Sequence, residues 1–216
     1  MDPQSVSRVA ILGASGGVGR RIVVRALERG FGVIGQTRNI DKLADLRDQI
    51  KILAFEPRDR AQLKKFLRGA DAAIFALGVD KLGTTTLFSE VTACLIAAMK
   101  TEGVRRLIAI TGVGAGETRG HGGFLYDRII FPLFTQKIYV DKDRQEALIV
   151  ASDLEWTIVR PAPFTISNVI DPIEIHTHLA ASTRLRRITR DEVAEFVVEQ
   201  LTCNRFLRQK PFIGHG

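Results

Sequence analysis

The chain has 216 residues, of which 45% are hydrophobic and 25% charged, with a net charge of +7. This composition is typical of a globular domain and excludes disordered, collagen-like and coiled-coil architectures. The longest apolar runs, such as Ala72–Val79, fall well short of the ~20 residues that span a bilayer, and Met1–Arg8 resembles no signal or transit peptide, so we expect a cytoplasmic protein without a membrane partner.

Short apolar runs alternate with longer amphipathic stretches along most of the chain, a pattern that predicts β-α-β units on a parallel sheet. The expected fold class is therefore α/β, a doubly wound parallel sheet of the NAD(P)-binding Rossmann type. In chain order, the predicted elements are a strand at Arg8–Leu12, a helix at Gly17–Gly30, a strand at Phe31–Gln36, a short helix at Ile40–Leu46, a strand at Ile50–Phe55, a helix at Asp59–Leu67, a strand at Asp71–Leu77, a helix at Thr84–Glu102, a strand at Val104–Thr111, a helix at Val140–Ser152 and a strand at Trp156–Arg160.

Two stretches interrupt this alternation. Residues 112–123 carry six glycines and lead into the apolar segment 124–134, which we interpret as a lid or a substrate wall. Beyond Pro161 the pattern changes to prolines, an arginine cluster, a helix near Asp191–Leu201 and a last strand near Pro211–Ile213. We expect one domain over residues 1–216, in which residues 161–216 form a small substrate-side cap.

A glycine-rich turn, Gly13-Ala-Ser-Gly-Gly-Val-Gly19, follows the first strand and opens the first helix. This is the context of a dinucleotide fingerprint, in which missing side chains let a diphosphate approach the backbone and the helix N-terminus attracts the anion. The alternative is an ordinary glycine-rich turn. The cofactor-binding residues predicted here are Gly13, Ser15, Gly16, Gly17, Val18 and Gly19.

The second strand ends in Thr37-Arg38-Asn39, where NAD-preferring folds place an acid that holds the ribose hydroxyls. Arg38 can instead pair with a 2′-phosphate, and Arg20 or Lys42 can add positive charge. The sequence therefore predicts NADP as the cofactor, with NADPH preferred over NADH. The alternative is that Arg38 is a solvated surface arginine.

Several motifs resemble the atypical short-chain dehydrogenase/reductase group of NmrA-like, NAD(P)H-binding proteins, which includes biliverdin-IXβ reductase, also called flavin reductase. The resemblance covers about residues 8–165 and implies that Glu56 lies near the adenine, that Ala76, Leu77 and Gly78 line the adenosine and ribose, and that Pro161–Pro163 lie by the nicotinamide. The motifs are Gly13–Gly19, Arg38, Gly69-Ala-Asp71, Ala76-Leu-Gly78 and Leu154-Glu-Trp-Thr-Ile-Val-Arg-Pro161.

Larger members of this group use a Ser, a Tyr and a Lys four residues after the Tyr, where the Tyr protonates the substrate carbonyl. Aligning Lys142 and Glu146 with the family's Lys and the Glu that follows it puts Ile138 at the Tyr position. At the end of the fifth predicted strand, the Ser position falls on Gly112, directly after Thr111. Since one residue rotates a helical side chain by ~100°, we expect Tyr139 to point elsewhere. The predicted catalytic residues are Thr111 and Lys142, which also contact the cofactor.

Without a strong protein acid, a reductase needs an acceptor such as a flavin, quinone, tetrapyrrole or polycyclic ketone, in which a conjugated system takes the hydride. Aromatic side chains concentrate before the predicted helix at 140–152, in a pattern suited to stacking on a planar ring system. The predicted substrate-binding residues are Phe124, Tyr126, Phe131 and Phe164. The favoured function is an NAD(P)H-dependent oxidoreductase. The alternatives are an NAD(P)H-binding redox sensor and a non-reductive tailoring enzyme acting on a polycyclic aromatic metabolite.

Other charged and metal-ligating residues form no convincing site. The dense cluster from Arg184 to Arg190 is interpreted as a solvated face of the cap, and the alternative is that it binds a carboxylated substrate. The other cations are scattered without interleaved aromatics, which disfavours nucleic acid. The two cysteines are expected to be buried as small hydrophobes, and the four histidines show no metal-ligand pattern, so no metal is predicted. Asp127 and Asp143 remain unassigned candidates for a general base.

Overall fold

The computed structural model describes residues 6–79, 84–112, 136–166, 172–180 and 182–216. Its strands and helices alternate as the sequence predicts, and the α/β doubly wound sheet is confirmed. The elements are β1 (Arg8–Leu12), α1 (Gly19–Glu28), β2 (Gly32–Thr37), the 3-10 helix η1 (Ile40–Leu46), β3 (Lys51–Ala54), α2 (Arg60–Leu67), β4 (Ala72–Phe75), α3 (Leu87–Glu102), β5 (Arg106–Ile110), α4 (Gln136–Val150), β6 (Glu155–Pro161), β7 (Glu174–His176), α5 (Arg190–Glu199) and β8 (Phe212–Gly214).

The strands join in the order β3-β2-β1-β4-β5-β6-β8-β7. The neighbouring strands from β3 to β8 pair in parallel, and β7 pairs with β8 in the antiparallel direction. The chain runs outward from β1 through β2 to β3, then crosses to β4 on the other side of β1. Ligands of such sheets bind outside the carboxyl ends of the strands, where this order reverses. The fold therefore points to the ends of β1 and β4 as the place for a site.

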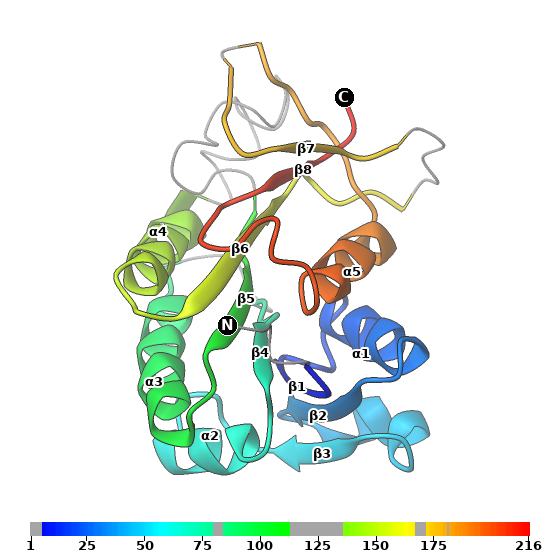
Figure 1. Ribbon diagram of the computed structural model, residues 1–216, viewed down its shortest axis with the longest axis vertical. Helices are drawn as coiled ribbons and strands as arrows, with labels where there is room; N and C mark the ends of the chain where they lie inside the picture. Colours follow the sequence, from blue (N-terminus) through cyan, green and yellow to red (C-terminus); the bar gives the residue numbers. More distant parts are fainter. Residues whose placement is uncertain (1–5, 80–83, 113–135, 167–171, 181) are drawn as a thin grey trace.

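Both faces of the sheet are covered by helices (Figure 1). Helices α1 and α5 pack on one face, over a core that includes Ile11, Ile22 and Val197. Helices α2, α3 and α4 cover the other face, over Leu12, Phe75 and Leu95. Burial on both faces explains why the central strands are apolar without alternation.

The C-terminal segment is part of the sheet as well as a cover for it. Strand β8 extends the sheet beside β6, and α5 is fastened to α1 by exposed ion pairs, among them Arg21 with Asp191 and Arg25 with Glu195. Its predicted role on the substrate side remains a prediction.

Element bounds differ from the predicted ones mainly at helix N-termini. Helix α1 begins at Gly19 because residues 13–18 form the glycine turn. Helix α4 begins at Gln136, four residues before the predicted Val140. The short strand β7 was not predicted, since three residues are too few for a clear alternation. In the part of the chain that the structure describes, no helix has the length and apolar character needed to cross a membrane.

Candidate functional site

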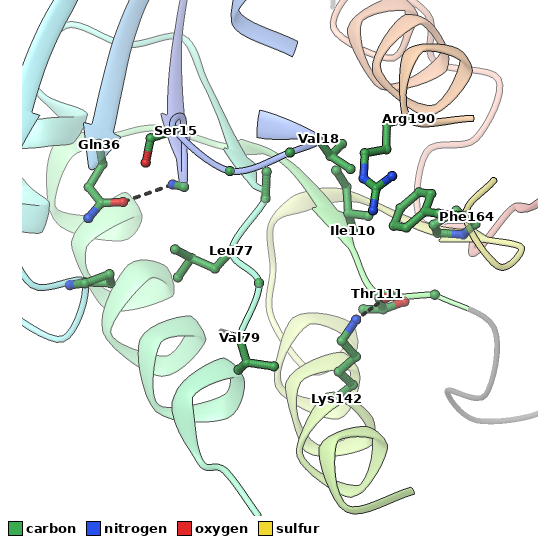
Figure 2. Close-up of a pocket in the computed structure, with 18 of the residues that line it drawn as sticks. Ser15, Val18, Gln36, Leu77, Val79, Ile110, Thr111, Lys142, Phe164 and Arg190 are labelled. Atoms are coloured by element: carbon green, nitrogen blue, oxygen red, sulfur yellow. Dashed lines mark hydrogen bonds between the residues drawn. The ribbon is translucent and has the colours of Figure 1, made fainter. Parts of the chain in front are cut away.

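A cavity of about 590 Å³ lies at the carboxyl ends of β1, β4, β5 and β6 (Figure 2). Its described walls carry four cationic side chains and no carboxylate, which makes it suited to a polyanion. Those cations are Arg38, Lys42, Lys142 and Arg190.

The glycine turn forms the floor of one end of this cavity. Gly13 adopts a φ of +87°, and a Cβ there would lie 2.8 Å from the carbonyl oxygen of Ala76. The N–H of Gly13 donates to Gln36 Oε1 at 3.0 Å (Figure 2). Gln36 Nε2 donates to the carbonyl of Phe55 at 2.7 Å. Gln36 thus fixes the turn to β2 and to the end of β3, a role that sequence reasoning missed.

Gly19 serves the turn by close packing rather than by lining the cavity. A Cβ on Gly19 would lie 2.1 Å from the carbonyl oxygen of Gly13, closer than any side chain allows. Gly16, Gly17 and Val18 do line the cavity, together with Ser15, whose hydroxyl is hydrogen-bonded to Thr37 at 2.8 Å. The first turn of α1 has no acidic residue and no side-chain cap, which suits a helix N-terminus that binds an anion.

Two cations stand at the β2 end of the cavity. Arg38 and Lys42 both line it and are exposed, whereas Arg20 is bound to Asp45 and to the carbonyl of Lys42 and does not line it. Of the two residues expected to assist Arg38, only Lys42 is in place.

The segment expected near an adenine is also present. Ala76, Leu77 and Gly78 line the cavity at the end of β4, in agreement with the resemblance. Glu56 does not: its exposed carboxylate lies 3.9 Å from Arg58, and the neighbouring Pro57 lines the cavity in its place.

Thr111 and Lys142 meet at the opposite end, between β5 and α4 (Figure 2). The Lys142 ammonium donates to the carbonyl of Thr111 and lies 5.2 Å from the ring centres of Phe88 and Tyr139. Burial lowers the pKa of Lys142 to about 8, and the nearby Glu146 carboxylate only partly opposes that shift. Lys142 is therefore mostly protonated at neutral pH and reaches its midpoint of protonation near pH 8.

Beneath this pair lies a buried network that orients it. The Thr111 hydroxyl donates to Glu146 at 2.8 Å, and Glu146 also pairs with Arg160 at 2.5 Å and with Lys210 at 3.4 Å. The Thr111 hydroxyl is thus held by a carboxylate, so the backbone carbonyl is the group it offers to Lys142.

The expectation that Tyr139 points away from the site is wrong. Ile138 packs in the core between α4 and the sheet, while Tyr139 lines the cavity. Residues three apart share a helix face, so Tyr139 and Lys142 lie on the same side of α4 although their spacing is not the family's four.

The geometry around Gly112 explains this arrangement. A Cβ on Gly112 would lie 2.7 Å from the Tyr139 hydroxyl oxygen, and Gly112 adopts a φ of +130°. The Tyr139 hydroxyl therefore occupies the space that a side chain at the family's Ser position would need. Sequence alignment alone gave no signal of this exchange.

Pro161, Ala162, Pro163 and Phe164 complete the far wall, as the resemblance implies for Pro161. Phe164 is 43% exposed, and Arg190 stands 4.7 Å above its ring (Figure 2). Arg190 was assigned to a solvated cluster; the other cluster arginines, Arg184, Arg186 and Arg187, are exposed, but Arg190 lines the cavity. The predicted Phe124, Tyr126 and Phe131 lie outside the described residues, as does Asp127.

The remaining polar candidates stand apart from the cavity. Asp143 does not line it. His176 pairs with Glu174 at 2.9 Å and His215 with Glu192 at 2.8 Å, and among the described residues no group of three potential ligands could hold a metal ion. Cys94 is buried and Cys203 half-buried, both as free thiols.

A family model described as NAD(P)H-binding matches residues 13–204, nearly the whole chain. The chain belongs to this NAD(P)H-binding family. Among curated proteins, the UPF0659 protein YMR090W of Saccharomyces cerevisiae is 22% identical over 209 residues, covering 91% of this chain and 88% of that protein.

Solved structures share the fold. ChuY from Escherichia coli O157:H7, described as an anaerobillin reductase, superposes with a TM-score of 0.79 at 20% identity, covering 96% of this chain and 97% of its own. A wide-type short-chain dehydrogenase/reductase from Veillonella parvula, solved with NADP, gives 0.77 at 13% identity, covering 97% and 95%. The predicted NAD(P)H-binding family is confirmed by the family match, and the solved structures confirm the fold.

The cavity fits the family's cofactor. The glycine turn leaves a side-chain-free cradle beside the N-terminus of α1, and no described wall residue carries the negative charge that would repel a dinucleotide phosphate. The turn, with Ser15, Gly16, Gly17 and Val18, would hold the diphosphate. The wall formed by Thr111, Lys142 and Pro161 would hold the nicotinamide ring.

Proposed function

We propose that the protein is an NADPH-dependent reductase of a planar conjugated acceptor, such as a flavin, quinone, tetrapyrrole or polycyclic ketone. The observation that carries the proposal is a single cavity that joins the glycine turn to Lys142 and Tyr139 and opens beside Phe164. Bound NADPH supplies the hydride. The half-exposed Phe164 ring offers a flat apolar surface on which an acceptor can stack.

The preference for NADPH rests on Arg38 and Lys42. Both cations line the cavity at the end of β2, where an acid would bind the ribose of NADH and repel a 2′-phosphate. An arginine there can form charge-assisted hydrogen bonds to the phosphate oxygens. Two cations line this end of the cavity and none of its described lining residues is a carboxylate, which supports NADP as the cofactor over NAD.

At the reacting end the chain provides proton carriers without the family's Ser-Tyr-Lys spacing. Tyr139 and Lys142 both line the cavity, and the lowered pKa of Lys142 lets it release a proton more readily than an exposed lysine does, near pH 8. A flavin or quinone draws its proton from solvent, whereas a ketone needs one from the protein. We assign that second role to the Tyr139 hydroxyl, with Lys142 beside it.

The test is NADPH oxidation followed at 340 nm against FMN, menadione, biliverdin and a polycyclic ketone. Turnover of at least one acceptor by the wild type, and none by a Gly16→Val variant, supports the proposal. NADPH binding by calorimetry without turnover of any acceptor contradicts it.

The alternatives are nucleotide binding without turnover, as in a redox sensor, and a non-reductive tailoring reaction. One observation favours them: Gly112 stands at the family's Ser position, and the neighbouring Thr111 hydroxyl is held by Glu146. The same acceptor panel separates these functions from a reductase.

A further inference from the structure

Arg190 reaches the cavity from a segment remote in sequence from the glycine turn. A Cβ placed on Gly17 would lie 3.2 Å from Arg190 Nε, so the Arg190 side chain passes directly over the turn. In Figure 2 it stands between Val18 and Phe164. It is therefore adjacent to the cradle that fits a diphosphate and not to the Arg38 end.

Independent contacts fix this placement. Arg21 donates to the carbonyl of Gly17 at 2.8 Å and to the Asp191 carboxylate at 2.9 Å, which ties the turn to the residue after Arg190. On the other side, Thr189 caps α5 in a capping box with Glu192. The residues before and after Arg190 therefore fix the position of its backbone next to the turn.

Helix stability does not account for an arginine at this position. Arg190 is the first residue of α5, where the helix dipole is positive and a cation is unfavourable. Its guanidinium makes no ion pair within the described part of the chain and contacts the Phe164 ring instead. An anion in the cavity would satisfy both the guanidinium and the positive end of the helix.

Backbone pairing brings the two side chains together. Thr165 N–H donates to the carbonyl of Ile188 at 2.9 Å, and Ile188 N–H donates to that of Pro163 at 3.1 Å. Phe164 and Arg190 thus project from neighbouring segments into the same wall, between the glycine turn and Pro163.

We propose that Arg190 binds the diphosphate of the dinucleotide from above the glycine turn, so that the C-terminal segment closes the nucleotide site. The guanidinium donates to phosphate oxygens on the side opposite the α1 N-terminus, and Phe164 supports its planar face. The inference rests on the family's nucleotide site and is independent of whether an acceptor is reduced.

Calorimetry with three nucleotides distinguishes this role from others. NADPH contains every group, 2′-phospho-ADP-ribose keeps the diphosphate but lacks nicotinamide, and adenosine 2′-monophosphate lacks the diphosphate. The variants are Arg190→Gln, Arg190→Lys and, as a control with the same loss of charge, Arg186→Gln, whose side chain is exposed.

We expect Arg190→Gln to weaken NADPH and 2′-phospho-ADP-ribose equally, by about tenfold or more, as for a lost charge-assisted hydrogen bond. Adenosine 2′-monophosphate should bind unchanged, Arg190→Lys should be intermediate, and Arg186→Gln should match the wild type. Undiminished NADPH affinity in Arg190→Gln overturns the proposal. So does a loss confined to NADPH, which would place Arg190 at the nicotinamide, and so does an equal loss for all three nucleotides.

Discussion

The two ends of the cavity are built differently. The nucleotide end is built around one continuous turn, residues 13–19, which the Gln36 side chain fixes through hydrogen bonds of 3.0 and 2.7 Å. The reacting end is assembled from the end of β5, one face of α4 and the segment after β6. The difference teaches that a short local motif fixes where the cofactor binds, whereas packing between distant elements decides which groups reach the reacting atoms.

The largest expected effect is at the nucleotide end. Gly16→Val should weaken NADPH binding by roughly 100-fold or more, because the branched side chain fills the diphosphate's approach to the backbone. Gly16 does not adopt a positive φ, so a side chain there needs only a small shift of the Gly13 carbonyl oxygen, which lies 3.2 Å from the position of a Cβ. We expect the variant to fold, and circular dichroism checks this.

Gly32→Val is the matched control for this change. Gly32 begins β2 outside the cavity, and a Cβ there meets nothing closer than 3.5 Å. It should bind NADPH as the wild type does in calorimetry, with both variants folded by circular dichroism. Normal NADPH binding by folded Gly16→Val would contradict the proposal that the glycine turn binds the diphosphate.

At the reacting end, the outcome should depend on the acceptor. Tyr139→Phe removes only the hydroxyl, so kcat for a ketone should fall by ~100-fold or more, the range of a positioned general acid. For FMN or menadione, which take protons from solvent, the change should stay within a few-fold. Steady-state kinetics with each acceptor checks this, and equal small effects on both classes would exclude Tyr139 as the proton donor.

Arg38 provides a smaller effect that is confined to the nucleotide end. Arg38→Ala should weaken NADPH by roughly tenfold while leaving NADH nearly unchanged, since only NADPH carries the 2′-phosphate. Calorimetry with both cofactors measures the difference. An equal loss for NADPH and NADH would show that Arg38 does not read the phosphate.

The smallest expected effect concerns pH. Lys142 has a pKa lowered to about 8, so it is charged below pH 8 and loses that charge above it. Its attraction for the anionic cofactor should therefore be constant at lower pH and decline above about 8, weakening NADPH by a few-fold. Titrations from pH 6.5 to 9.5 check this, and Lys142→Met should abolish the decline. A pH dependence that persists in Lys142→Met would belong to another group.

Local patterns made most of the fold and the nucleotide end predictable. The apolar strands and the turn at Gly13–Gly19 act through neighbours a few residues away, so their spacing in sequence predicts their structure. Glu56 shows the limit of assigning residues by resemblance. The resemblance implied that Glu56 lies near the adenine, but the neighbouring Pro57 is the residue that lines the cavity.

The reacting end depended on contacts that no spacing encodes. Tyr139 could not be placed by its offset from Ile138, because its direction depends on the space left by Gly112 on another element. Arg190 follows three exposed arginines in the sequence, and its direction into the cavity follows from the capping of α5 and from the contacts of Arg21. Such contacts between remote segments carry no local sequence signal.

Hydride transfer within a single turnover tests the central claim most directly. Enzyme in excess over NADPH, or over NADPH deuterated at C4, is mixed with FMN, menadione, biliverdin or the ketone, and the absorbance at 340 nm is followed. We predict rapid loss of NADPH absorbance with at least one planar acceptor, slowed by deuterium at the transferred position. Saturated NADPH binding with no loss of absorbance for any acceptor would contradict the account and leave a protein that binds the nucleotide without using it.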